Sequence, residues 1–158
     1  MGNSILVAVA LQRFADITPR AMAVREIAAD LAKTYNAPLT VLTVHVQLAL
    51  MPEGETTEEK MARFVAPLIE KGLRVESLVR EGSPRVLIPQ TAKEIGARLI
   101  VMGSHSKRGI LDTAVGGTAK AVIANAPCRV LLVATTAKED QRTRELIIPE
   151  YPFIFPYG

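Results

Sequence analysis

The chain has 158 residues, the length of one domain. Its composition, 49% hydrophobic and 22% charged, excludes a disordered or low-complexity protein. A single cysteine, Cys128, excludes an intrachain disulfide and a cysteine-based zinc site, which is typical of a reducing cytoplasm. The apolar run over residues 5–11 is too short for a membrane span or a signal peptide. We therefore expect a cytoplasmic protein with no role at a membrane.

The net charge of +3 is too small to indicate a nucleic-acid-binding protein. Five cationic residues and one acidic residue lie from Arg98 to Arg129, so this stretch carries the whole positive excess. It contains none of the aromatic residues on which single-strand binders stack bases. We expect no nucleic-acid partner. The charge pattern alone fits either an anion site or an ordinary fluctuation of composition.

Apolar, β-branched runs alternate with helical patterns along the chain. The predicted strands cover residues 5–10, 39–46, 73–79, 99–102 and 129–134. Helices are predicted between them, and Thr18-Pro19 and Ser83-Pro84 each offer a capping side chain followed by proline at the first helical position. This alternation predicts an α/β fold, an open doubly wound parallel sheet of five strands with helices on both faces.

The loop after the fourth predicted strand carries most of the chemistry. Parallel sheets of this class bind ligands at the carboxyl ends of their strands. The loop ends where a helix begins, and free N–H groups and the helix dipole favour an anion there. Gly116 and Gly117 allow a ligand to approach the backbone closely. Thr118 offers a hydroxyl, and Lys107 or Arg108 can neutralise phosphate charge. The pattern is neither a Walker loop nor a dinucleotide fingerprint.

Several stretches resemble the universal stress protein family: Gly82-Ser-Pro84, the run from Ala97 to His105, Gly116-Gly-Thr118 and the run from Ala126 to Val133. The resemblance spans roughly residues 3 to 135. It implies a three-layer α/β/α fold with strand order 3-2-1-4-5 and a role in the stress response. It also implies a homodimer formed by pairing of the fifth strands.

Members of this family bind ATP or AMP, and magnesium could arrive with the phosphates. The resemblance implies that Val9 and Val44 line the base pocket, with Met102 close to it and Ala10 at the end of the first strand. The residues expected to cradle ribose and phosphates are Gly103, Ser106, Gly116, Gly117 and Thr118, helped by Lys107 or Arg108.

Three positions depart from the pattern of the nucleotide-binding members. Ala10 stands where an aspartate often helps to hold the nucleoside, and Ser106 replaces the second glycine. Gly117 stands at the hydroxyl position, with Thr118 one place late. An alternative function therefore stays open, a nucleotide-free dimeric interaction module with a degenerate cleft. Such a module would recruit a protein partner through its dimer surface and its C-terminal tail.

The sequence does not predict an enzyme or a metal site. The residue types of a hydrolytic triad are present as His45, His105, Ser104, Ser106 and Asp112, but the nucleophile elbow is absent. Two histidines without clustered carboxylates do not make a transition-metal site. Cys128 is expected to be a small buried hydrophobic residue.

The C-terminal segment differs in composition from the rest. We divide the chain into a domain over residues 1–136 and an extension over residues 137–158. Residues 138–145 carry charges of both signs, as in a solvated linker or a short helix. The aromatic residues Tyr151, Phe153, Phe155 and Tyr157 follow between prolines. We expect this stripe to contact another subunit or a partner, with folding back onto its own domain as the alternative.

Overall fold

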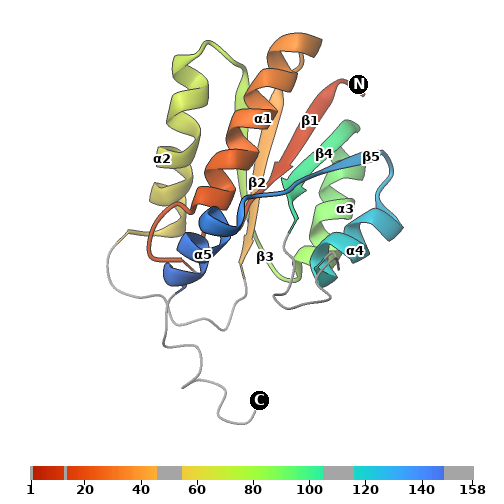
Figure 1. Cartoon of the computed structure of the whole chain (residues 1–158). Helices are drawn as coiled ribbons and strands as arrows, with labels where there is room; N and C mark the ends of the chain where they lie inside the picture. Colours follow the sequence, from red (N-terminus) through yellow and green to blue (C-terminus); the bar gives the residue numbers. More distant parts are fainter. Residues whose placement is uncertain (1, 13, 46–54, 105–115, 148–158) are drawn as a thin grey trace.

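The computed structural model describes residues 2–12, 14–45, 55–104 and 116–147. Strands and helices alternate along the chain (Figure 1). The strands are β1 (Ser4–Ala8), β2 (Leu39–His45), β3 (Val75–Glu81), β4 (Ala97–Gly103) and β5 (Arg129–Val133). The helices are α1 (Pro19–Tyr35), α2 (Thr57–Glu70), α3 (Pro84–Ile95), α4 (Gly117–Asn125) and α5 (Ala137–Glu145).

The strands form one five-stranded sheet in the order β3-β2-β1-β4-β5. Every neighbouring pair is parallel, and Val7 of β1 lies opposite Val41 of β2 and Val101 of β4. The predicted fold class and strand order are confirmed. β3 is one edge of the sheet and β5 is the other.

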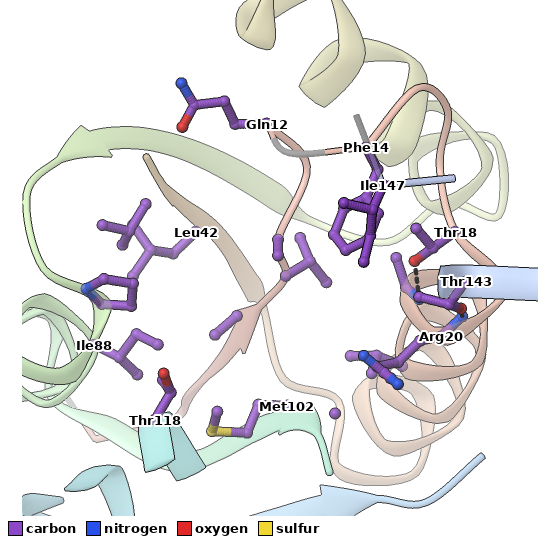
Figure 2. A pocket seen from close by; sticks show the side chains of 18 of the residues that line it. Gln12, Phe14, Thr18, Arg20, Leu42, Ile88, Met102, Thr118, Thr143 and Ile147 are labelled. Atoms are coloured by element: carbon purple, nitrogen blue, oxygen red, sulfur yellow. Dashed lines mark hydrogen bonds between the residues drawn. The ribbon is translucent and has the colours of Figure 1, made fainter. Parts of the chain in front are cut away.

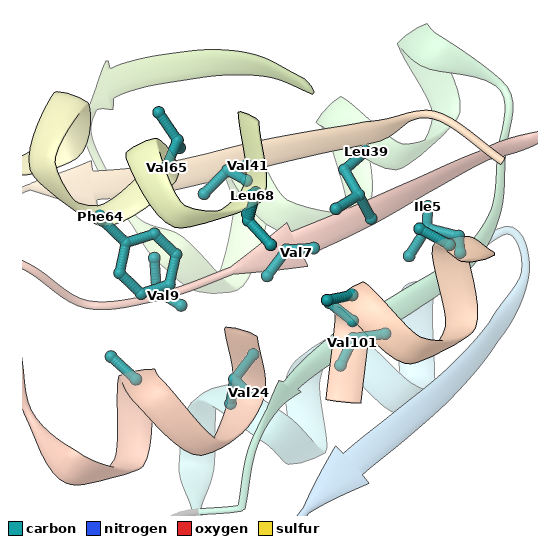
Figure 3. Packing of buried hydrophobic residues seen from close by; sticks show 14 of the residues in the cluster. Ile5, Val7, Val9, Val24, Leu39, Val41, Phe64, Val65, Leu68 and Val101 are labelled. Atoms are coloured by element: carbon teal, nitrogen blue, oxygen red, sulfur yellow. The ribbon is translucent and has the colours of Figure 1, made fainter. Parts of the chain in front are cut away.

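Helices cover both faces of the sheet (Figure 1). Alternate residues of β1 point to opposite sides, so Val7 packs with α1 and α2 while Leu6 packs with α3 and α4. Figure 3 shows the first of these clusters, in which Val24 of α1 and Leu68 of α2 approach Val7. Among the described residues, the core is aliphatic or methionine apart from Phe64, which is fully buried, and Phe14.

The helix starts bear out one predicted cap and correct the other. The Thr18 hydroxyl accepts a hydrogen bond of 3.0 Å from the Ala21 N–H, as expected for a capping residue. Ser83 occupies the corresponding position before α3, but its side chain makes no cap hydrogen bond, so that prediction was wrong. A capping hydroxyl would have accepted a hydrogen bond from the Val86 N–H. This N–H donates instead to the Ser83 carbonyl at 3.1 Å.

The strand boundaries shift by about two residues in places that matter for the site. The β1 ladder ends at Ala8 and not at residue 10. The Val9 N–H still donates to the Leu42 carbonyl at 3.0 Å, so Val9 is fixed to the sheet just beyond the strand. Val9 and Ala10 thus begin the loop at the carboxyl end of the sheet.

Of the two expectations for residues 138–145, the helix is the one observed. α5 begins with a capping box between Thr136 and Glu139 and packs against α1 (Figure 1). The four tail aromatic residues lie outside the described residues. Among the described helices, none is long and apolar enough to span a bilayer.

Candidate functional site

A cavity of about 500 Å³ lies at the carboxyl ends of β1, β2 and β4 (Figure 2). β1 and β4 are neighbours in the sheet, but the helices that follow them cover opposite faces. The two connections therefore diverge and leave a crevice between them, the usual ligand position in open α/β sheets. The position of the cavity follows from the order of the strands.

The structure brings six of the predicted site residues together. The predicted residues that line the cavity are Val9, Ala10, Val44, Met102, Gly103 and Thr118. Gly116 and Gly117 lie beside Thr118, as the N-cap and first residue of α4, without lining the cavity themselves. Ser106, Lys107, Arg108 and His105 lie outside the described residues.

The start of α4 presents backbone N–H groups at one end of the cavity. Its N-cap is Gly116, and no described side chain caps the helix. A Cβ atom on Gly117 would lie 2.5 Å from Nη2 of Arg85, so the guanidinium of Arg85 packs over this glycine. Arg85 comes from the first turn of α3 and makes no ion pair with a described residue.

Arg85 and the start of α4 repel each other, because the amino end of a helix carries a partial positive charge. An anion bound between them would be stabilised by both. The sequence analysis missed Arg85. The only signal for it was its place one residue after Pro84, at the start of a helix that begins at the same edge of the sheet.

The opposite side of the cavity is built on Arg20, which packs over Gly103. A Cβ atom on Gly103 would lie 2.9 Å from Cδ of Arg20 and 3.0 Å from its Cγ, so a side chain at this position would force Arg20 to shift. The guanidinium of Arg20 pairs with the Asp140 carboxylate of α5 at 2.9 Å. Partial burial raises the pKa of Asp140, but hydrogen bonds from Thr135 and Arg20 outweigh it and hold this pKa below its usual value.

The buried side chain of Lys60 fixes the loop between β1 and α1. The Nζ of Lys60 donates hydrogen bonds to the carbonyls of Leu11, at 3.1 Å, and Phe14, at 2.7 Å. Burial lowers the pKa of this amine. The Thr43 hydroxyl accepts a further hydrogen bond from the Leu11 N–H at 3.3 Å. These contacts fix the position of Phe14, which lines the cavity.

Other cavity residues were not predicted. The polar ones are Gln12, Thr18, Arg20, Thr143 and Arg144, and the large apolar ones include Phe14, Ile88 and Ile147. Thr18 and Arg20 follow the first strand, so their position after a carboxyl end was a usable signal. Thr143, Arg144 and Ile147 lie more than 120 residues away along the chain, and no local pattern relates them to the site.

The described lining of the cavity contains no aspartate, glutamate, histidine or cysteine. His45 is the last residue of β2 and is half-buried. Cys128 was expected to be buried, but it is only half-buried. It packs against the hydrophobic cluster under α3 and α4, and burial raises the pKa of its thiol. No group of three potential metal ligands occurs within the described ranges.

Comparison with known proteins identifies the family. The sequence model of the universal stress protein family matches residues 3–134. The chain belongs to this family. A putative universal stress protein of Staphylococcus haemolyticus is 28% identical over 137 residues, 78% of this chain and 83% of that protein. The universal stress protein E homolog of Haemophilus influenzae is 39% identical over 62 residues, 39% of this chain and only 20% of that longer protein.

Solved structures of universal stress proteins share the fold. One from Archaeoglobus fulgidus gives a TM-score of 0.66 at 23% identity and covers 87% of this chain, which spans 45% of that one. An Archaeoglobus fulgidus structure in complex with dAMP gives 0.58 at 23% identity, covering 81% and 94% of the two chains. An Arabidopsis thaliana member with AMP bound gives 0.60 at 20% identity, covering 86% and 94%.

Proposed function

We propose that this universal stress protein binds an adenine nucleotide, AMP or ATP, in the cavity at the carboxyl ends of β1, β2 and β4. Binding would serve a regulatory role in the stress response. The observation that carries the proposal is that an apolar cavity ends at the start of α4, which no described side chain caps, with Arg85 beside it. An apolar body with an anionic end is the ligand that such a cavity takes.

The cavity residues divide in the way a nucleotide requires. Val9, Val44 and Met102 supply apolar surface for a flat base. Thr118 and the N–H groups at the start of α4 supply hydrogen-bond donors for phosphate oxygens. The complexes of relatives with dAMP and with AMP support the same class of ligand.

The departures from the family pattern leave both the apolar surface for the base and the hydrogen-bond donors for the phosphate in place. Gly117 lacks the usual hydroxyl, but Arg85 packs over it and adds a charge that phosphate can pair with. Ala10 removes a carboxylate from the nucleoside end, so we expect weaker recognition of the ribose than in relatives with aspartate there. The third departure, Ser106, lies outside the described residues.

The proposal requires neither a resident metal nor catalysis. Magnesium would come with the phosphates of ATP and be held by their oxygens and by water. We propose binding without catalysis, because the described lining offers no carboxylate or imidazole to act as a general base.

We further propose that the protein is cytoplasmic and a homodimer. The single cysteine supports the first point. The exposed edge of β5 supports the second, because such an edge can add a strand from another chain. The tail aromatic residues remain candidates for a contact with the second subunit or with a protein partner.

Calorimetric titration of the full chain with AMP and with ATP tests the proposed function. We expect saturable binding with a dissociation constant below a millimolar. Absence of heat with both nucleotides at millimolar concentration would contradict the proposal and favour an interaction module without a nucleotide.

The variant Thr118→Val tests the position of the phosphate. It keeps the shape of the side chain but removes the hydroxyl that would donate to a phosphate oxygen. We expect AMP affinity to fall about tenfold, since a hydrogen bond to a charged group contributes about 1.5 kcal/mol or more. Thr34→Val, at an exposed position of α1 outside the cavity lining, is a matched control and should bind AMP as the wild type does.

A further inference from the structure

One wall of the cavity comes from beyond the residues matched by the family model, which end at residue 134. Thr143 and Arg144 of α5 and Ile147 after it all line the cavity. Thr143 is only 2% exposed, so α5 is seated against its neighbours at this point. The ligand space is therefore shaped in part by the C-terminal segment.

This wall is attached at several separate points. Asp140 pairs with Arg20, whose backbone N–H also donates to the Thr143 hydroxyl at 3.3 Å. The Ala15 N–H donates to the Leu146 carbonyl at 2.7 Å. Phe14 and Ile147 form an antiparallel bridge, and Figure 2 shows their side chains next to each other. The contacts extend from α1 to the loop after β1, so the wall has one defined position.

On the α4 side, positive charge comes from Arg85 and the helix start, and on this wall it comes from two arginines. The charge of Arg20 is matched by Asp140. Arg144 lines the cavity but makes no ion pair with any described residue, and its charge acts on Asp140 only at longer range. Arg20 packs over Gly103, a residue expected to contact the ribose and phosphates, so this wall faces that part of the ligand from across the cavity.

We propose that α5 is part of the ligand site and that Arg144 binds the anionic group of the ligand from the side opposite α4. Phe14 and Ile147 cover the apolar part of the ligand next to it. The inference rests on the proposed function, because it takes the ligand to be an adenine nucleotide. It assigns a binding residue to a segment outside the family domain.

Two arginines of the same helix provide a matched test. Arg142 and Arg144 are both exposed on α5, but only Arg144 lines the cavity. The full chain, Arg144→Ala, Arg144→Lys and Arg142→Ala are titrated with AMP and with adenosine, which lacks the anionic group. Thermal unfolding of each variant shows that the fold is retained.

We expect Arg144→Ala to weaken AMP binding about tenfold, the effect of one charge-assisted hydrogen bond. Adenosine binding should not change, and Arg144→Lys should recover part of the loss. Arg142→Ala should stay within about twofold of the wild type for both ligands, as surface substitutions usually do.

The outcomes separate this inference from the proposed function. AMP binding by the wild type with no loss in Arg144→Ala would overturn the inference and leave the proposed function standing. An equal loss for AMP and adenosine would also overturn it, because Arg144 would then act on the structure and not on the anion. A wild type that binds neither ligand would overturn both.

Discussion

Gly103 and Arg20 show how a single hydrogen atom in place of a side chain shapes this cavity. Arg20 crosses the end of β4 so closely that a methyl group on Gly103 would contact its Cγ and Cδ. The arginine is held there by Asp140, so it cannot move away without losing an ion pair. The constraint on this residue is therefore space and not backbone conformation.

We expect Gly103→Ala to lower the free energy of unfolding by about 1–3 kcal/mol, the usual cost of overpacking. The cost should nearly vanish in an Arg20→Ala background, because the atoms that the new methyl group meets are gone. Chemical denaturation of the two single variants and the double variant measures this coupling. An equal cost of Gly103→Ala in both backgrounds would contradict the packing account.

Single site residues were predictable where they lie close to a strand end. Val9 and Val44 lie in the last residues of predicted apolar strands, Met102 ends one and Gly103 follows it. The family resemblance assigned these residues to the site, and parallel strands bring such ends to one edge. Arg85 was not predictable in this way, because its role depends on packing over Gly117 in a different helix. That contact depends on how closely α3 and α4 pack, which one sequence does not encode locally.

Among the helices, α5 is the one whose position the sequence could not reveal. Nearly all of its residues are polar and only Thr143 is buried. It therefore lacks the apolar face from which packing against the domain could be predicted. The other helices were predictable because each follows an apolar strand and buries a recognisable face. α5 is held by an ion pair and hydrogen bonds to residues more than 100 positions away.

The docking of α5 should depend on pH through Asp140. Its pKa is lowered from the ordinary 3.8, so the folded state binds its proton less readily than the unfolded state. The stabilisation is therefore complete above about pH 5 and is lost as the pH falls below 3.8 toward the lowered value.

We expect Asp140→Asn to lower the free energy of unfolding by about 1–3 kcal/mol at neutral pH, because Arg20 loses its charged partner. The difference from the wild type should shrink as the pH falls below 3.8. Denaturation curves at several pH values measure both. A difference that does not shrink anywhere in the acid range below pH 3.8 would contradict the ion-pair account.

The protein as a whole has two sheet edges among the described strands, β3 and β5. Leu131 of β5 is 37% exposed, a large apolar residue at the edge we propose for the homodimer. Leu131→Lys should shift the mass measured by light scattering from two chains to one, because edge lysines oppose strand pairing. Ile69→Lys, at an exposed apolar residue of α2, should leave the dimer intact. A single-chain mass for the wild type, or a dimer of Leu131→Lys, would contradict this proposal.

A crystal structure of the full chain grown with AMP tests the nucleotide proposal most directly. We predict electron density for the base between Val9, Val44 and Met102, and for the phosphate between the start of α4 and Arg144. Fully occupied AMP elsewhere on the protein, or a cavity without nucleotide at saturating AMP, would contradict the account.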